Sequence, residues 1–217
     1  MDLINQEIVM FDLLLKGGVV VGPILLCSVV ALAIFIERLL HFIQSRMKED
    51  TVVGSVVPLV KKGACHQALQ IADRSATPMG RILAHAMEVI SQDREIMETV
   101  IAHAMEEEVR NSSRYLQTLA TIGNIAPLLG LLGTVLGMIK AFMVIQEMGG
   151  KVNAAVLAGG IWEAMLTTAL GLCVALPVMV GHSYLQSWVD KQEARLQHGT
   201  VEFLKAVGYR QAEGKIC

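Results

Sequence analysis

Three long stretches without a single Asp, Glu, Lys or Arg constrain this chain more than any other feature. They cover residues 17–36, 115–139 and 164–189. Each is long enough for a helix of about 20 residues, the length that crosses the hydrocarbon core of a bilayer. Only helices and closed barrels satisfy their backbone groups in lipid, and continuous apolar runs of this length exclude barrel strands. We therefore predict an all-α membrane protein with three transmembrane helices and long helical extensions.

Composition and motifs narrow the possible functions. Charged residues make up 18% of the chain, below the roughly 25% of a soluble domain. The net charge is −2 with scattered basic residues, which argues against a nucleic-acid partner. We find no phosphate-binding loop, nucleophile elbow or metal-ligand spacing, so we expect no enzyme activity, cofactor or metal. The four cysteines are far apart, which predicts no structural disulfide: Cys27, Cys65, Cys173 and Cys217.

The distribution of lysine and arginine predicts the topology. Basic residues collect after the first span, before the second and after the third, and such residues favour the inner side of a membrane. The predicted segments are an outer N-terminal tail (1–16), transmembrane helix 1 (17–41), an inner helical segment (42–114), transmembrane helix 2 (115–145), an outer turn (146–153), transmembrane helix 3 (154–189) and an inner C-terminal tail (190–217). We expect no cleaved signal peptide, because the region before the first span is acidic rather than basic.

The segment 42–114 has its own helical pattern. Thr77-Pro78 interrupts it, and a new helix is expected from Met79 to about Ile90. An apolar stripe follows at Met97, Ile101, Ala104, Met105 and Val109. With no glycine or proline after it, we expect this helix to enter the second span unbroken. The run Glu106-Glu107-Glu108 is interpreted as a solvated face.

Small residues and one proline mark the second and third spans. Small side chains let neighbouring membrane helices approach closely, and proline is tolerated where neighbours supply hydrogen-bond partners. We expect this packing, together with the stripe, to join neighbouring copies into a homo-oligomer. The residues assigned to packing are Gly130, Gly133, Gly137, Pro127 and Gly171.

One acidic residue lies within the third apolar region. An acidic side chain at a helix centre costs roughly 2.5–3.5 kcal/mol to insert, so Glu163 is expected to face a partner or a water-filled cavity. The alternative is a hydrated position near the outer interface. Thr134 and Thr168 would lie at similar depth on antiparallel helices, and Thr167 shares a helix face with Glu163. Each hydroxyl has a simpler alternative, a hydrogen bond to the carbonyl one turn earlier.

Two sequence stretches carry a family resemblance. ATIGNIAPLLGLLGTVLGMIKAF (120–142) and WEAMLTTALGLCVALP (162–177) resemble the second- and third-span signatures of the ExbB/TolQ/MotA family, most closely ExbB. The order of the predicted segments also matches that of ExbB. The chain departs from the commoner pattern at Leu136, Lys140 and Thr167. The four-span MotA branch fits less well, because this chain has three spans.

The resemblance implies a function, a location and partners. It implies a multi-pass protein of the bacterial inner membrane, with a periplasmic N-terminus and a cytoplasmic C-terminus. The copies would form a pentamer with a central pore lined by Thr134, Thr168 and Glu163, and Thr167 is assigned to the same pathway. A dimer of a single-span partner, ExbD-like or TolR-like, would sit in that pore with one membrane aspartate that protons reach, and a TonB-like energy transducer would act with the complex.

We thus expect a proton-channel subunit of a motor that uses the proton-motive force to energise TonB-dependent transport across the outer membrane. One alternative is a TolQ-like subunit of the Tol-Pal motor for envelope integrity. The other, from a different class, is a passive membrane scaffold or channel without energy coupling.

Overall fold

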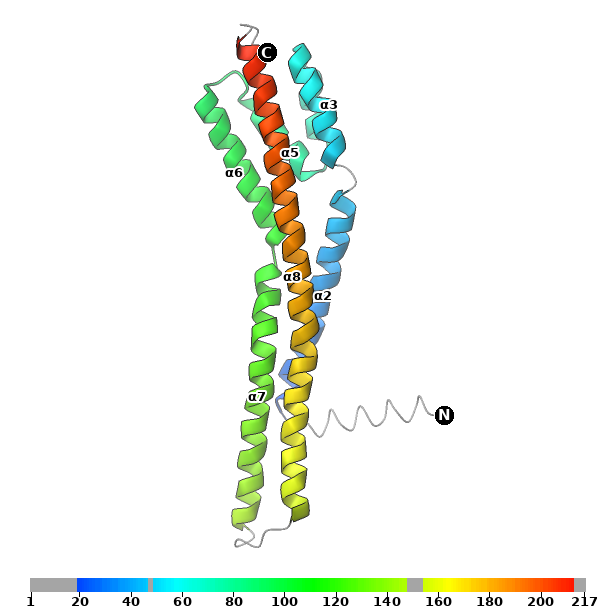
Figure 1. The fold of residues 1–217 in the computed structure, drawn as a ribbon, viewed down its shortest axis with the longest axis vertical. Coiled ribbons are helices and arrows are strands. Elements are labelled where there is room, and N and C mark those ends of the chain that lie inside the picture. Colours follow the sequence, from blue (N-terminus) through cyan, green and yellow to red (C-terminus); the bar gives the residue numbers. More distant parts are fainter. Residues whose placement is uncertain (1–18, 47–48, 148–153, 213–217) are drawn as a thin grey trace, which may run out of the picture. The chain divides into compact units, whose positions relative to one another are not determined.

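The computed structural model describes residues 19–46, 49–147 and 154–212, which form helices joined by short turns (Figure 1). Within those ranges there is no strand, and three helices are long and apolar enough to span a membrane. The all-α prediction is therefore confirmed. The outer tail 1–16 and most of the turn 146–153 lie outside the described residues. The helices are α2 (Val21–Arg46), α3 (Glu49–Lys62), α4 (Cys65–Arg74), α5 (Pro78–Glu88), α6 (Arg94–Ser113), α7 (Leu116–Glu147) and α8 (Ala154–Ala212).

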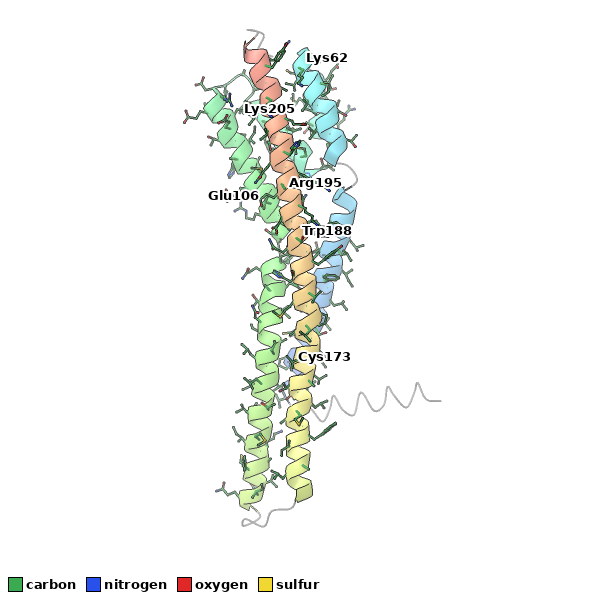
Figure 2. The ribbon with its side chains drawn as sticks, viewed as in Figure 1. Lys62, Glu106, Cys173, Trp188, Arg195 and Lys205 are labelled. Carbon is green, nitrogen blue, oxygen red and sulfur yellow. The ribbon has the colours of Figure 1, made fainter. Side chains whose placement is uncertain are left out.

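The chain divides into two compact units. Of the described residues, the first unit, here the span unit, comprises 19–37, 115–147 and 154–184, and the second, the extension unit, comprises 38–46, 49–114 and 185–212. Helix α8 contributes to both units and is continuous over 59 residues, including Pro177. Cys173 lies on its span-unit part, whereas Trp188, Arg195 and Lys205 lie on its extension-unit part (Figure 2).

The extension unit has an apolar core between short helices and the C-terminal part of α8. Its fully buried side chains include Val56, Ile82 and Phe203. The interruption predicted at Thr77-Pro78 is present. The Thr77 hydroxyl accepts a hydrogen bond from the Gly80 amide at 3.1 Å, and proline occupies the first turn, where its missing N–H costs nothing.

Helix α6 corrects the interpretation of the acidic run. Its buried face continues from Met97 and Ile101 to Glu108, which is only 7% exposed. The Arg81 guanidinium donates two hydrogen bonds to this carboxylate, at 2.6 and 2.5 Å. The hydrogen bond to Glu108 raises the pKa of Arg81, against the opposing effect of burial. Glu106 and Glu107 are exposed, so only two members of the run form a solvated face.

The expectation of an unbroken helix into the second span is wrong. Helix α6 ends at Ser113 and α7 begins at Leu116, with Tyr115 in the left-handed region at φ 65°. The break exposes carbonyls at the end of α6, and the buried Arg38 donates to the Asn111 carbonyl at 3.1 Å. The preceding Asn-Ser-Ser sequence provides the physical reason, because short polar side chains compete with the backbone for its hydrogen bonds.

The cysteine prediction also needs correction, because Cys65 is disulfide-bonded. Distance along the chain does not limit distance in space when helices fold back on one another. Spacing alone therefore could not exclude a bridge.

We predict that Glu108→Gln destabilises the extension unit by about 1–2 kcal/mol, because it removes the charge that pairs with Arg81. The loss stays below that of a fully buried pair, since half of the Arg81 side chain is exposed. Chemical unfolding of the detergent-solubilised protein, followed by circular dichroism, measures the effect. The matched control is Glu107→Gln on the exposed face, for which we expect less than about 0.5 kcal/mol. Equal effects of the two substitutions would contradict the assignment.

Candidate functional site

Small residues bring α7 and α8 into close contact within the span unit. A Cβ added at Gly130 would lie 3.0 Å from the Thr168 Cα atom, and one added at Gly137 would lie 3.0 Å from the Ala164 Cβ atom. At Gly171 an added Cβ would lie 2.6 Å from the Ala126 carbonyl oxygen. The glycine-rich face of α7 therefore contacts α8 of the same copy. The sequence predicts that this face and the α6 stripe meet neighbouring copies, but the glycines and three stripe residues, Met97, Ile101 and Ala104, are already buried within one chain.

Two threonines predicted from the sequence are half-buried in this helix pair. The Thr168 hydroxyl donates to the Gly130 carbonyl of α7 at 3.0 Å, so it links the two helices. The Thr134 hydroxyl donates to the Leu131 carbonyl in the preceding turn of its own helix at 2.6 Å. The simpler hydrogen bond to the preceding turn is thus present at Thr134, whereas Thr168 makes an interhelical bond that its sequence position did not reveal.

Thr167 occupies a different environment, although it neighbours Thr168 in sequence. It is 2% exposed, and its hydroxyl donates to the Ala164 carbonyl at 2.7 Å. A Cβ added at Gly133 would clash with the Thr167 hydroxyl oxygen at 2.3 Å. The structure therefore places Thr167 inside the α7–α8 contact, covered by its own chain.

Glu163 has a basic partner on the neighbouring helix. The Lys140 ammonium lies 3.6 Å from the Glu163 carboxylate, and the two side chains are 64% and 32% exposed respectively. The carboxylate is therefore neither isolated nor fully buried.

Pro127 lies elsewhere in α7, is half-buried, and does not interrupt the helix.

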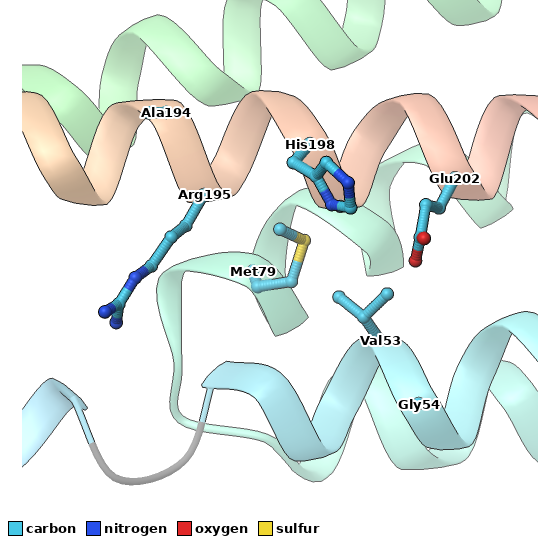
Figure 3. A pocket seen from close by; sticks show the side chains of 8 residues that line it. Val53, Gly54, Met79, Ala194, Arg195, His198 and Glu202 are labelled. Carbon is cyan, nitrogen blue, oxygen red and sulfur yellow. The ribbon is translucent and has the colours of Figure 1, made fainter.

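The extension unit contains a groove of about 470 Å³ between α3, α5 and α8. His198 and Glu202 lie along one side of it, with Met79 and Val53 opposite, and Arg195 points away from the pair (Figure 3). None of the residues that line the groove carries a hydroxyl, thiol or amine nucleophile. The groove thus holds two potential bases, His198 and Glu202, but no hydroxyl, thiol or amine nucleophile for them to activate. Among the described residues no cluster of His, Cys, Asp and Glu is suited to hold a metal.

Two ion pairs were missed by the sequence analysis, and each left a signal. Glu108 lies four residues after Ala104, at the next position on the buried face of α6. Extending the helical repeat of the apolar stripe by one step would therefore have predicted a buried Glu108. Lys140 is the lone basic residue of α7 and Glu163 the lone acidic residue of the apolar part of α8, which suggests a pair once the helices are known to be neighbours.

Comparison with known proteins gives consistent matches. Residues 74–198 match the MotA/TolQ/ExbB proton channel family. A putative biopolymer transport protein ExbB homolog from Methanothermobacter thermautotrophicus is 29% identical over 84% of this chain, which spans 64% of that relative's length. The putative biopolymer transport protein ExbB-like 1 from Synechocystis is 33% identical over 92% of this chain and 76% of its own length. The Tol-Pal system protein TolQ from Haemophilus influenzae is 34% identical over 52% of this chain and 48% of its own length.

We predict that Gly171→Ala destabilises the α7–α8 pair by about 1–3 kcal/mol, because the new methyl group would meet backbone that cannot rotate away. The matched control is Gly159→Ala, where an added Cβ meets no atom within 4 Å. Unfolding by increasing denaturing detergent, monitored by circular dichroism, compares the two variants. A Gly171→Ala protein as stable as the Gly159→Ala protein would refute the close contact.

Proposed function

The chain belongs to the MotA/TolQ/ExbB proton channel family, and on that premise we propose that it energises TonB-dependent transport across the outer membrane. As a family member it is a proton-channel subunit of an ExbB/TolQ-type motor. The proposed setting is the bacterial inner membrane, with the N-terminus in the periplasm and the C-terminus in the cytoplasm. The seven segments predicted from the sequence give the proposed threading through that membrane.

The observation that carries the proposal is the hydrogen bonding of the two half-buried threonines. Each hydroxyl proton is committed to a carbonyl, that of Gly130 for Thr168 and that of Leu131 for Thr134. The hydroxyl oxygens still have lone pairs that accept hydrogen bonds. A protonated carboxyl group is a donor, so these oxygens suit the neutral, protonated form of a carboxylate carried by a partner.

The proposed proton carrier is therefore a membrane aspartate on a single-span partner of the ExbD or TolR kind, present as a dimer. The exposed aliphatic side chains of α7 would form a dewetted wall that conducts poorly without that carrier. Glu163 would shape the outer approach to the pathway, with Thr134 and Thr168 deeper. Thr167 is assigned to packing, since its own chain covers it.

A homo-oligomer, most simply a pentamer, would enclose this pathway. Because the glycine-rich face of α7 is used within each copy, neighbouring copies would meet through other apolar surfaces. Helix α7 exposes a set of large apolar side chains, part of which would line the pathway and part of which would meet a neighbouring copy: Leu128, Leu131, Leu132, Val135, Leu136 and Ile139.

The ExbB branch is favoured over the TolQ branch by the extent of similarity. The ExbB-like relative matches 92% of this chain, whereas the TolQ relative matches 52%. A Tol-Pal role is the second candidate function. Restoration of receptor-driven uptake in cells that lack their own ExbB, without restoration of envelope integrity in cells that lack TolQ, separates the branches.

Proton flux tests the coupled function. A proton that crosses 100 mV releases roughly 2.3 kcal/mol, which is useful only where leakage is prevented. In liposomes that hold the chain and its single-span partner, we expect an imposed gradient to drive proton flux. Thr168→Val and Glu163→Ala should lower that flux at least tenfold, and receptor-driven uptake should fall with it.

The matched control is Thr121→Val, on the exposed surface of the same helix pair, where the hydroxyl donates only to the preceding turn. Flux in the control should match wild type. A wild-type complex without gradient-driven proton flux would favour the passive scaffold. Full flux and uptake in Thr168→Val and Glu163→Ala would remove both residues from the pathway.

Topology gives an independent prediction. In a background without native cysteines, single cysteines at positions 61 and 211 should resist a membrane-impermeant thiol reagent added from the periplasm, whereas one at position 150 should react. The distribution of basic residues favours the inner side for the first two positions and the outer side for the third. Labelling at position 61 but not at position 150 would reverse the orientation.

A further inference from the structure

The single basic residue of α7 faces the single acidic residue of the apolar part of α8. Lys140 is the only Lys or Arg in residues 115–147, and Glu163 is the only Asp or Glu in residues 154–189. Their charged atoms lie 3.6 Å apart. Each charge alone is costly in an apolar helix. The contact between them across the helix pair therefore indicates that each charge lowers the free-energy cost of the other.

The tight packing of the two helices fixes this meeting. Residues next in sequence to each charge make glycine contacts: Ala164 lies against Gly137, and Ala141 against Gly160. A Cβ added at Gly160 would lie 2.6 Å from the Ala141 Cβ atom. The two charged side chains therefore project beside close contacts between α7 and α8, so the packing of the helices keeps their points of attachment near each other.

We propose that Lys140 is a positioning residue that neutralises Glu163 and so excludes metal cations from the outer mouth, the surface around these two side chains. The inference rests on the proposed proton-channel function and adds an ion specificity to it. About a third of the Glu163 side chain is exposed, so at the proposed outer mouth ions in solution would reach it. An unpaired carboxylate there attracts Na⁺ and K⁺ as well as hydronium. Beside the ammonium group the net charge is zero, yet the carboxylate oxygens still accept hydrogen bonds from water or from a protonated carboxyl group.

A cysteine at position 159 reports the local charge. Gly159 is exposed, and an added Cβ meets no atom within 4 Å, so Gly159→Cys fits without strain. It lies one helical turn before Glu163 on the same face of α8. The full chain, with its native cysteines replaced, is placed in nanodiscs. Modification rates are then measured with a cationic and an anionic methanethiosulfonate reagent of similar size.

The ratio of the cationic to the anionic rate gives the sign of the charge at the mouth. Lys140→Gln should raise the ratio about tenfold by leaving the carboxylate unpaired, and Glu163→Gln should lower it by a similar factor. The double substitution, and the exchange Lys140→Glu with Glu163→Lys, should return the ratio to within about twofold of wild type. A merely structural role would change both rates in the same direction.

The matched control is a cysteine at position 54, exposed on α3 with open space around an added Cβ. Its ratio should not respond to any of these substitutions. If Lys140→Gln and Glu163→Gln fail to shift the ratio at position 159 in opposite directions, the proposed neutralisation is wrong.

Ion flux tests the specificity. In liposomes that hold the chain and its single-span partner, Lys140→Gln should admit K⁺ at least tenfold faster than wild type, and the charge exchange should restore exclusion. If the wild-type complex carries protons but Lys140→Gln leaves the K⁺ flux unchanged, this inference fails and the proposed function stands. If the wild-type complex carries no protons, the proposed function itself fails, and the ion specificity fails with it.

Discussion

Close contact between α7 and α8 is the constraint on which the polar chemistry of the span unit depends. Membrane helices gain no hydrophobic stabilisation from each other in lipid, so small residues and interhelical hydrogen bonds must hold them together. Glycines at positions 130, 133, 137 and 171 remove the side chains that would separate the backbones. Only with the backbones this close does the Thr168 hydroxyl reach the Gly130 carbonyl, and the Lys140 ammonium the Glu163 carboxylate.

The extension unit solves a different problem. It holds an apolar core between short helices, yet one carboxylate lies within it. Glu108 is accommodated because the Arg81 guanidinium meets both of its oxygens, and Arg81 itself remains half-exposed to water. The desolvation of the pair is therefore partial, which makes it less costly than a pair enclosed on all sides. Arg38 fills a related need, since it gives a second donor to the Asn111 carbonyl, which also accepts a long hydrogen bond of 3.4 Å from the Arg114 amide.

The sequence correctly predicts the features that depend on the helical repeat of apolar residues and on composition. The three apolar runs, the helix start at Thr77-Pro78 and the start of α8 at Ala154 all follow from local chemistry. It failed where distant residues decide the outcome. The bonded Cys65 is not marked by its neighbours in sequence, and the Asn-Ser-Ser run before the left-handed Tyr115 does not by itself fix where the helix ends. The different environments of Thr167 and Thr168 depend on the position of Gly133 on another helix. No pattern within the third span contains that information.

Helix α8 is continuous, whereas α6 and α7 are separated by a break. This difference decides where the length of the chain can change during evolution. Helix α8 runs without a break from Ala154 to Ala212, so one inserted residue would rotate every later side chain by about 100°. Phe203 and Leu196 would leave the core while exposed neighbours took their place. The junction at Arg114 and Tyr115, by contrast, separates α6 from α7, so a change of length there alters neither helical register. Changes in chain length should therefore accumulate at this junction and be removed by selection throughout α8.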